Sequence, residues 1–111
     1  MIAGFILTGG TSDNGIAVRG IGPSLTQFGI TNALSDTTLE LRDNNGALVV
    51  ANDNWQDDPT MPTELIAHGL ALQNPLESGI YALLPAGLYT AILEGNNAGT
   101  GVGLVEVYNV H

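Results

Sequence analysis

The sequence has 111 residues, 44% of them hydrophobic and 12% charged, and its formal net charge is −9 because eleven acidic side chains outnumber two arginines. This balance excludes a nucleic-acid-binding surface and attraction to an anionic membrane, since both need clustered basic side chains. The sequence has no cysteine, which excludes disulfides, thiolate zinc sites and cysteine nucleophiles. Length and hydrophobic content predict a single folded domain over residues 1–111.

Short runs of Ile, Val, Leu and Thr are separated by glycine and proline, which predicts β-strands divided by turns along the whole chain. The strands are predicted over residues 2–8, 16–21, 37–42, 47–51, 78–83, 88–94 and 102–110. Asn14-Gly15 is a strong hairpin signal before the second strand, and residues 43–46 predict a further hairpin. These segments give about seven or eight strands.

Two short helical segments interrupt the strands. A helical turn is predicted over 24–28, because Gly29 can close it. A helix is predicted near 62–68, because Pro62 suits the first helical position and Gly69 can end the helix. Alternating strands each bury one face, so the sequence predicts an all-β fold, an antiparallel two-sheet sandwich that is jelly-roll-like and has one short helix.

Several segments together resemble a known kind of module. They are Ile2-Ala-Gly-Phe5, Arg19-Gly-Ile-Gly-Pro-Ser-Leu25, Asn52-Asp-Asn-Trp55, Leu84-Pro-Ala-Gly-Leu-Tyr-Thr-Ala91 and Thr100-Gly-Val-Gly-Leu-Val-Glu-Val-Tyr108. In this order they resemble uncharacterised β-rich modules of large secreted bacterial proteins, and residues 84–91 are loosely similar to pre-peptidase C-terminal domains. The resemblance implies a secreted β-sandwich, extracellular or at the cell surface, without established catalytic residues. Such modules often carry a strand before the Ile-Ala-Gly-Phe segment, and its absence would leave a sheet edge open for pairing.

Catalytic motifs are missing from the sequence. His68 and His111 are far apart in the chain, and there is no Gly-x-Ser-x-Gly elbow, His-Glu-x-x-His motif or phosphate loop. We therefore expect no enzymatic activity, no catalytic residues and no organic cofactor.

A polar loop over residues 52–58 supplies several oxygen ligands within a short span. Calcium prefers such ligands, and the set that could hold it is Asp43, Asn45, Asp53, Asp57 and Asp58. The spacing does not match an EF-hand loop. The alternative is that these Asp and Asn side chains accept hydrogen bonds from their own backbone in turns.

Trp55 is the single tryptophan of the chain, and it allows two interpretations. An exposed indole beside polar groups can stack on a sugar ring, which gives a candidate carbohydrate site made of Asn52, Asp53, Asn54, Trp55 and Asp57. A lone tryptophan in a chain with few aromatics is more often part of the core. The sequence leaves both interpretations open.

Arg19 and Arg42 are the two basic side chains of the chain. Each lies in a predicted strand, and acidic residues greatly outnumber them. We expect structural ion pairs, with Arg19 paired across strands to Glu106 or to Glu40.

Residues 1–10 form an uncharged, apolar segment that is rich in strand formers. The segment is too short to span a bilayer, so we expect no membrane insertion. It can be an inner strand of its own sandwich, or it can be shared with a neighbouring subunit, which would drive self-association. The residues expected at such a contact are Ile2, Ala3, Phe5, Ile6 and Leu7.

These observations lead to two functional hypotheses. The first is a non-enzymatic extracellular structural module that associates with itself into a homopolymer, as the subunit of a filament or surface layer. The alternative is an accessory module of a larger secreted protein that binds carbohydrate or another surface ligand through the loop around Trp55 and is stabilised by calcium.

Overall fold

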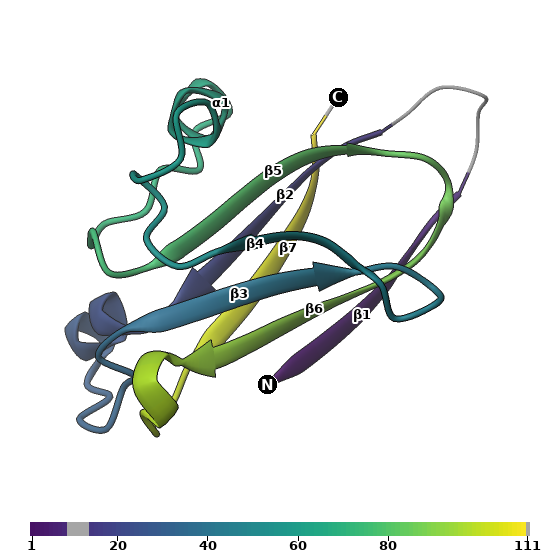
Figure 1. Cartoon of the computed structure of the whole chain (residues 1–111). Coiled ribbons are helices and arrows are strands. Elements are labelled where there is room, and N and C mark those ends of the chain that lie inside the picture. The colour runs from purple at the N-terminus through teal and green to yellow at the C-terminus, as the bar shows by residue number, and fades with distance from the viewer. Residues whose placement is uncertain (9–13, 111) are drawn as a thin grey trace.

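The computed structural model describes residues 1–8 and 14–110. Within these residues, seven strands form two antiparallel sheets (Figure 1), which confirms the predicted all-β, two-sheet sandwich. The strands are β1 (Ile2–Leu7), β2 (Asn14–Ile21), β3 (Thr37–Arg42), β4 (Leu48–Asn52), β5 (Ser78–Leu84), β6 (Gly87–Gly95) and β7 (Leu104–Val110). The first sheet has the order β1-β6-β3-β4, and the second has the order β5-β2-β7.

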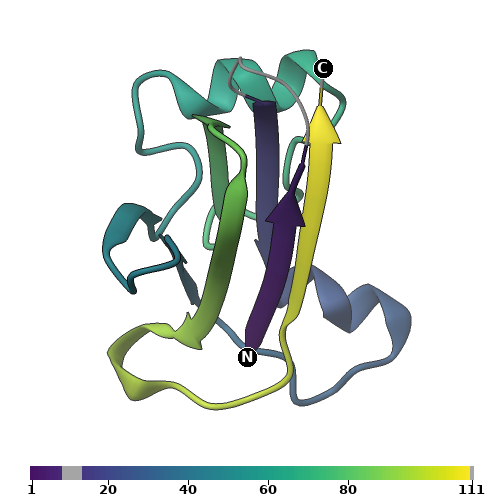
Figure 2. The same ribbon diagram turned by 90° about the vertical axis from the view of Figure 1, so that its right-hand side faces the viewer.

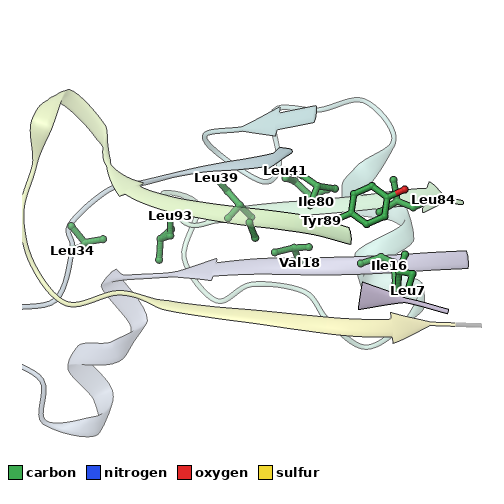
Figure 3. Close-up of a cluster of buried hydrophobic side chains, with 11 residues drawn as sticks. Leu7, Ile16, Val18, Leu34, Leu39, Leu41, Ile80, Leu84, Tyr89 and Leu93 are labelled. Carbon is green, nitrogen blue, oxygen red and sulfur yellow. The ribbon is translucent and has the colours of Figure 1, made fainter. Parts of the chain in front are cut away.

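The main core lies between the two sheets, because the strands alternate apolar and polar residues. In β3, for example, Thr37, Leu39 and Leu41 are buried while the residues between them stay partly exposed. The buried cluster (Figure 3) consists of Leu7, Ile16, Val18, Leu34, Leu39, Leu41, Ile80, Leu84, Tyr89, Ala91 and Leu93. Burial of each large aliphatic side chain contributes roughly 1.5–3 kcal/mol, so this cluster holds the two sheets together.

A second, smaller cluster covers the outer face of the second sheet. The central strand β2 is therefore buried on both faces, with Val18 toward the first sheet and Ala17 toward the outer cluster. The buried members of the outer cluster are Ala17, Ile21, Leu25, Trp55, Leu65 and Leu72. Two short helical elements contribute to it, the 3-10 helix η1 (Pro23–Phe28) and the helix α1 (Met61–Ala67).

Both helical predictions are confirmed to within one residue. The backbone of Gly29, just after η1, and of Gly69, shortly after α1, is left-handed, as expected for glycines that end helical segments. A further short 3-10 segment, η2 (Asn96–Ala98), follows β6. None of the helices among the described residues has the length and apolar character needed to cross a membrane.

Of the two predicted hairpins, one is confirmed and one is wrong. Residues 43–46 join β3 to β4, with Gly46 at φ +79° and its N–H donating to the carbonyl of Asp43. Asn14 and Gly15, in contrast, are the first residues of β2. They cannot join a hairpin of the first two strands, because β1 pairs with β6 while β2 pairs with β5 and β7. Residues 9–13 lie outside the described part of the chain.

The sandwich has two flanks, each formed by one edge strand of each sheet. On one flank β4 contacts β5, and toward the other β6 contacts β7. The edge strands β1 and β7 therefore lie on the same flank, which Figure 2 views directly, with β1 between β6 and β7. This flank positions the candidate site.

Candidate functional site: the open edge of strand β1

The hydrogen-bond pattern of β1 shows which of its backbone groups have no partner among the described strands. Met1 and Leu93 exchange two bonds, since the Met1 amino group donates to the Leu93 carbonyl and the Leu93 N–H donates to the Met1 carbonyl, both at 2.8 Å. In an antiparallel pair such bonds recur at every second residue. The odd-numbered residues of β1 therefore bond to β6, and the N–H and C=O groups of Ile2, Gly4 and Ile6 face the open edge.

The side chains of β1 alternate in the same way. Phe5 and Leu7 point into the sandwich, where the Phe5 ring stacks on Tyr89 at 5.7 Å between ring centroids. Ile2 and Ile6 are 69% and 70% exposed on the outer face. The same two isoleucines thus combine unused backbone groups with exposed apolar side chains.

The neighbouring strand extends this apolar surface. Ile2 lies opposite Ile92 of β6, and Ile6 lies opposite Leu88, which is itself exposed. Between them, a Cβ atom added to Gly4 would approach no closer than 4.0 Å to the nearest atom, the Tyr89 carbonyl oxygen. Glycine is therefore not required at position 4 by the packing of the monomer, and it leaves the centre of the edge flat.

The other three edges, as far as the described residues show, carry features that hinder strand pairing. The pairing of β4 with β3 shifts register between Leu41 and Arg42, and such bulges twist an edge away from partners. β7 carries the charged residue Glu106, and β5 is contacted by α1 and β4. The edge of β1 has a continuous register and no charged side chain.

The five predicted assembly residues are thus placed together on β1, but they divide between its two faces. Ile2 and Ile6 are exposed, Leu7 is buried, and Ala3 and Phe5 are partly buried. The inward residues on this flank are incompletely covered, and Val105 and Val107 of β7 are also only partly buried against the core. The flank therefore presents an apolar seam beside an open edge.

The acidic residues predicted to hold calcium are used mainly within their own turns. Oδ1 of Asp43 accepts hydrogen bonds from the N–H groups of Asn45 and Ala47, at 2.9 and 3.0 Å. Oδ1 of Asp58 accepts bonds from the N–H groups of Thr60 and Met61 at the start of α1, and these bonds lower the pKa of Asp58. The turn interpretation therefore holds for Asp43 and Asp58.

Asp53 lies in a different environment, beside a second carboxylate. The side-chain amide of Asn96 lies 3.1 Å from Oδ2 of Asp36 and 3.4 Å from Oδ2 of Asp53. Partial burial, followed by the negative charge of Asp36, raises the pKa of Asp53 above its ordinary value of 3.8. Across residues 1–8 and 14–110, no three acidic or histidine side chains converge as metal ligands would, so the predicted calcium set is not brought together.

Asp53→Asn is expected to raise the melting temperature at pH 7 by about 1–3 °C. A carboxyl group whose pKa is raised by folding stabilises the fold fully below 3.8, and this contribution is lost as the pH rises through the folded-state pKa. The amide removes the repulsion with Asp36, and the gain is small because solvent screens the largely exposed Asp53. Circular dichroism melts at pH 7 and pH 3 measure it, and an equal gain at both values would contradict the argument.

The same variant tests the calcium hypothesis. Oδ1 of Asp36 and Oδ1 of Asn54 are buried and have no hydrogen-bond partner among the described residues. If these oxygens and Asp53 bind calcium, millimolar calcium raises the melting temperature of the wild type and not that of Asp53→Asn. An unchanged wild-type melting temperature excludes a calcium site here.

The candidate carbohydrate site does not present an exposed aromatic face. The Trp55 side chain is 4% exposed and packs in the outer cluster. Oδ1 of Asn52 accepts a hydrogen bond from the Gly79 N–H at 3.0 Å, and the Asn54 amide donates to Asp57 at 3.4 Å. Trp55 and Asn52 therefore have structural roles, which agrees with the core interpretation of the tryptophan.

Two ion pairs and one buried carboxylate account for further charged side chains. Arg19 pairs with Glu106, and its Nε donates to Oε1 at 2.8 Å, which confirms one of the two predicted partners. The other predicted partner, Glu40, pairs with Arg42. Glu77 was not predicted to matter, yet its side chain is fully buried and its carboxylate binds the start of η1. No local pattern in the sequence distinguishes Glu77 from the exposed acids.

Comparison with known proteins adds no relative. No protein-family model, curated protein or solved structure matches this chain. The geometry of the β1 edge and the composition of the chain therefore carry the functional argument.

Proposed function

We propose that this domain is a non-enzymatic structural module that associates with itself outside the cell, through the edge of β1, as the subunit of a filament or surface layer. The observation that carries the proposal is the coincidence, at Ile2 and Ile6, of unused backbone groups with exposed apolar side chains. An open, uncharged edge of this kind is a template for adding a strand from another chain.

The charge distribution is compatible with contact at this edge. Copies with a net charge of −9 repel each other, and solvent ions screen this repulsion. A contact made by β1 places no carboxylate against a carboxylate, since residues 1–8 contain no acidic side chain. We therefore expect association to strengthen with salt concentration. The low charged fraction of the chain and its resemblance to secreted modules support a location outside the cell.

Ile6→Lys is expected to abolish association through the edge of β1 and leave a folded domain. Ile6 is 70% exposed, so the monomer loses little packing, whereas a lysine on an edge strand hinders the pairing of that edge with a second strand. The matched control is Leu83→Lys, since Leu83 on β5 is 61% exposed and gains the same charge away from β1.

Analytical ultracentrifugation over a range of protein and salt concentrations, with negative-stain microscopy, measures the outcome. The wild type and Leu83→Lys are expected to form ordered assemblies, and Ile6→Lys is expected to form none while staying folded, with the melting temperature of the wild type at concentrations where the wild type does not associate. A wild type that is monomeric at every concentration, or an Ile6→Lys variant that assembles normally, would refute the proposal.

A further inference from the structure

The outward-facing residues of β1 have the same order in both directions along the strand. Its outward residues are Ile2, Gly4 and Ile6, so the side chains are symmetric about Gly4. The backbone groups that face the open edge belong to the same residues and are spaced symmetrically about Gly4 as well. A strand with this symmetry is complementary to a second copy of itself placed antiparallel to it.

We infer that two copies of the chain pair β1 against β1 in antiparallel orientation, around a two-fold axis that passes through Gly4. This inference rests on the proposed self-association and names its partner and register. In this register Ile2 lies opposite Ile6 of the second copy, and Gly4 lies opposite Gly4 of the second copy. Ile2, Gly4 and Ile6 thus form three facing pairs, each with two backbone hydrogen bonds.

The inward face of the strand fits the same register. Because Gly4 faces Gly4 of the second copy, the numbers of any two facing residues add up to eight. Ala3 therefore lies opposite Phe5 of the second copy. A small side chain then faces a large one, and each is only partly covered within one copy. Pairing would also bring a second strand toward the apolar seam beside Val105 and Val107, which are incompletely buried in the monomer.

Charge favours a second copy as the occupant of this edge. Met1 to Thr8 carry no charged side chain, and the outer face nearest the edge is formed by Ile2, Ile6, Leu88 and Ile92. The two-fold contact therefore joins two surfaces without charged side chains on a strongly acidic chain, and it is isologous, so it closes as a dimer. A filament or layer would then use this dimer as its repeating unit and a second contact for growth.

Single-cysteine variants test the register, because the natural chain has no cysteine. Residues that face each other in a hydrogen-bonded antiparallel pair have Cα atoms about 5.5 Å apart, within the range that a disulfide spans. Gly4→Cys is expected to form a disulfide-linked dimer under mild oxidation, and the space around Gly4 accommodates the new side chain. Ile2→Cys and Ile6→Cys are each expected to stay unlinked, because each would lie roughly 13 Å or more from its own copy in the partner.

The double variant Ile2→Cys/Ile6→Cys is expected to form linked dimers again, since residue 2 faces residue 6 of the second copy. Leu83→Cys on β5 controls for random collisional cross-linking. Non-reducing gel electrophoresis of the full chain, at concentrations where the wild type associates, gives the readout.

The outcomes separate the two proposals. A wild type that assembles while Gly4→Cys stays unlinked overturns the two-fold register and leaves self-association standing. Linked dimers of Ile2→Cys alone and Ile6→Cys alone indicate parallel pairing and overturn the register as well. A wild type that never associates removes the self-association on which the inference rests.

Discussion

Glu77→Ala is expected to lower the free energy of unfolding by about 3–5 kcal/mol, because several buried donors lose their acceptor, and this is a large part of the stability of a small domain. The carboxylate is buried, and its Oε2 accepts hydrogen bonds from the N–H groups of Gly22 and Ser24 and from the Ser24 hydroxyl, at 2.6–3.0 Å. Its Oε1 accepts a further bond from the Asn74 N–H at 3.3 Å. Alanine leaves these donors without an acceptor, at about 1–3 kcal/mol for each buried group.

Glu77 matters because it joins segments that are distant in the sequence. Its side chain binds the end of β2 and the start of η1. Its backbone carbonyl accepts a hydrogen bond from the backbone N–H of Trp55 at 2.9 Å. The loss should therefore loosen η1 and the loop around Trp55 together. Urea unfolding measures the effect, with Glu94→Ala as the control because Glu94 is exposed. Equal stabilities of the two variants would show that the Glu77 network contributes little.

Elements governed by local chemistry could be predicted closely from the sequence. The alternation in residues 37–42 predicted β3 with its observed bounds, because one face of the strand is buried and the other is not. The signals of Pro62 and Gly69 placed α1 within one residue. The turn chemistry of Asp43 was one of the two interpretations that the sequence offered, since an aspartate in a turn can accept hydrogen bonds from backbone N–H groups close in sequence.

The assignment of strands to sheets could not be predicted, because it depends on contacts between distant residues. Asn14-Gly15 is a local hairpin signal, but β2 is held between β5 and β7, and the non-local pairing overrides the turn preference. Glu77 was missed for the same reason, since its partners Gly22 and Ser24 are more than fifty residues away.

The candidate site illustrates both cases. The absence of charged side chains from β1 was visible in the sequence, which is why its residues were predicted to form a contact. That β1 is an edge strand depends on the sheet order, which only the structure provides. The symmetry about Gly4 bears on strand pairing only because the hydrogen bonds show that the backbone groups of Ile2, Gly4 and Ile6 face the open edge.

Trp55→Ala is expected to lower the free energy of unfolding by about 3–5 kcal/mol, the usual cost of deleting a large buried aromatic side chain. The indole is 4% exposed and shares the outer cluster with Leu65 and Leu72, so its removal leaves a cavity between the second sheet and its helical cover. Urea unfolding measures the loss. The matched variant is Trp55→Phe, which keeps most of the ring volume.

Trp55→Phe also separates a packing role from a polar one. The indole N–H is buried and has no hydrogen-bond partner among the described residues, so the substitution by phenylalanine removes no hydrogen bond. We therefore expect Trp55→Phe to retain most of the stability and the association of the wild type. In the wild type, the fluorescence of this single tryptophan should be poorly quenched by iodide and insensitive to added glycans. A Trp55→Ala variant that keeps its stability but loses glycan binding would instead place Trp55 in a ligand site and favour a binding module over a structural one.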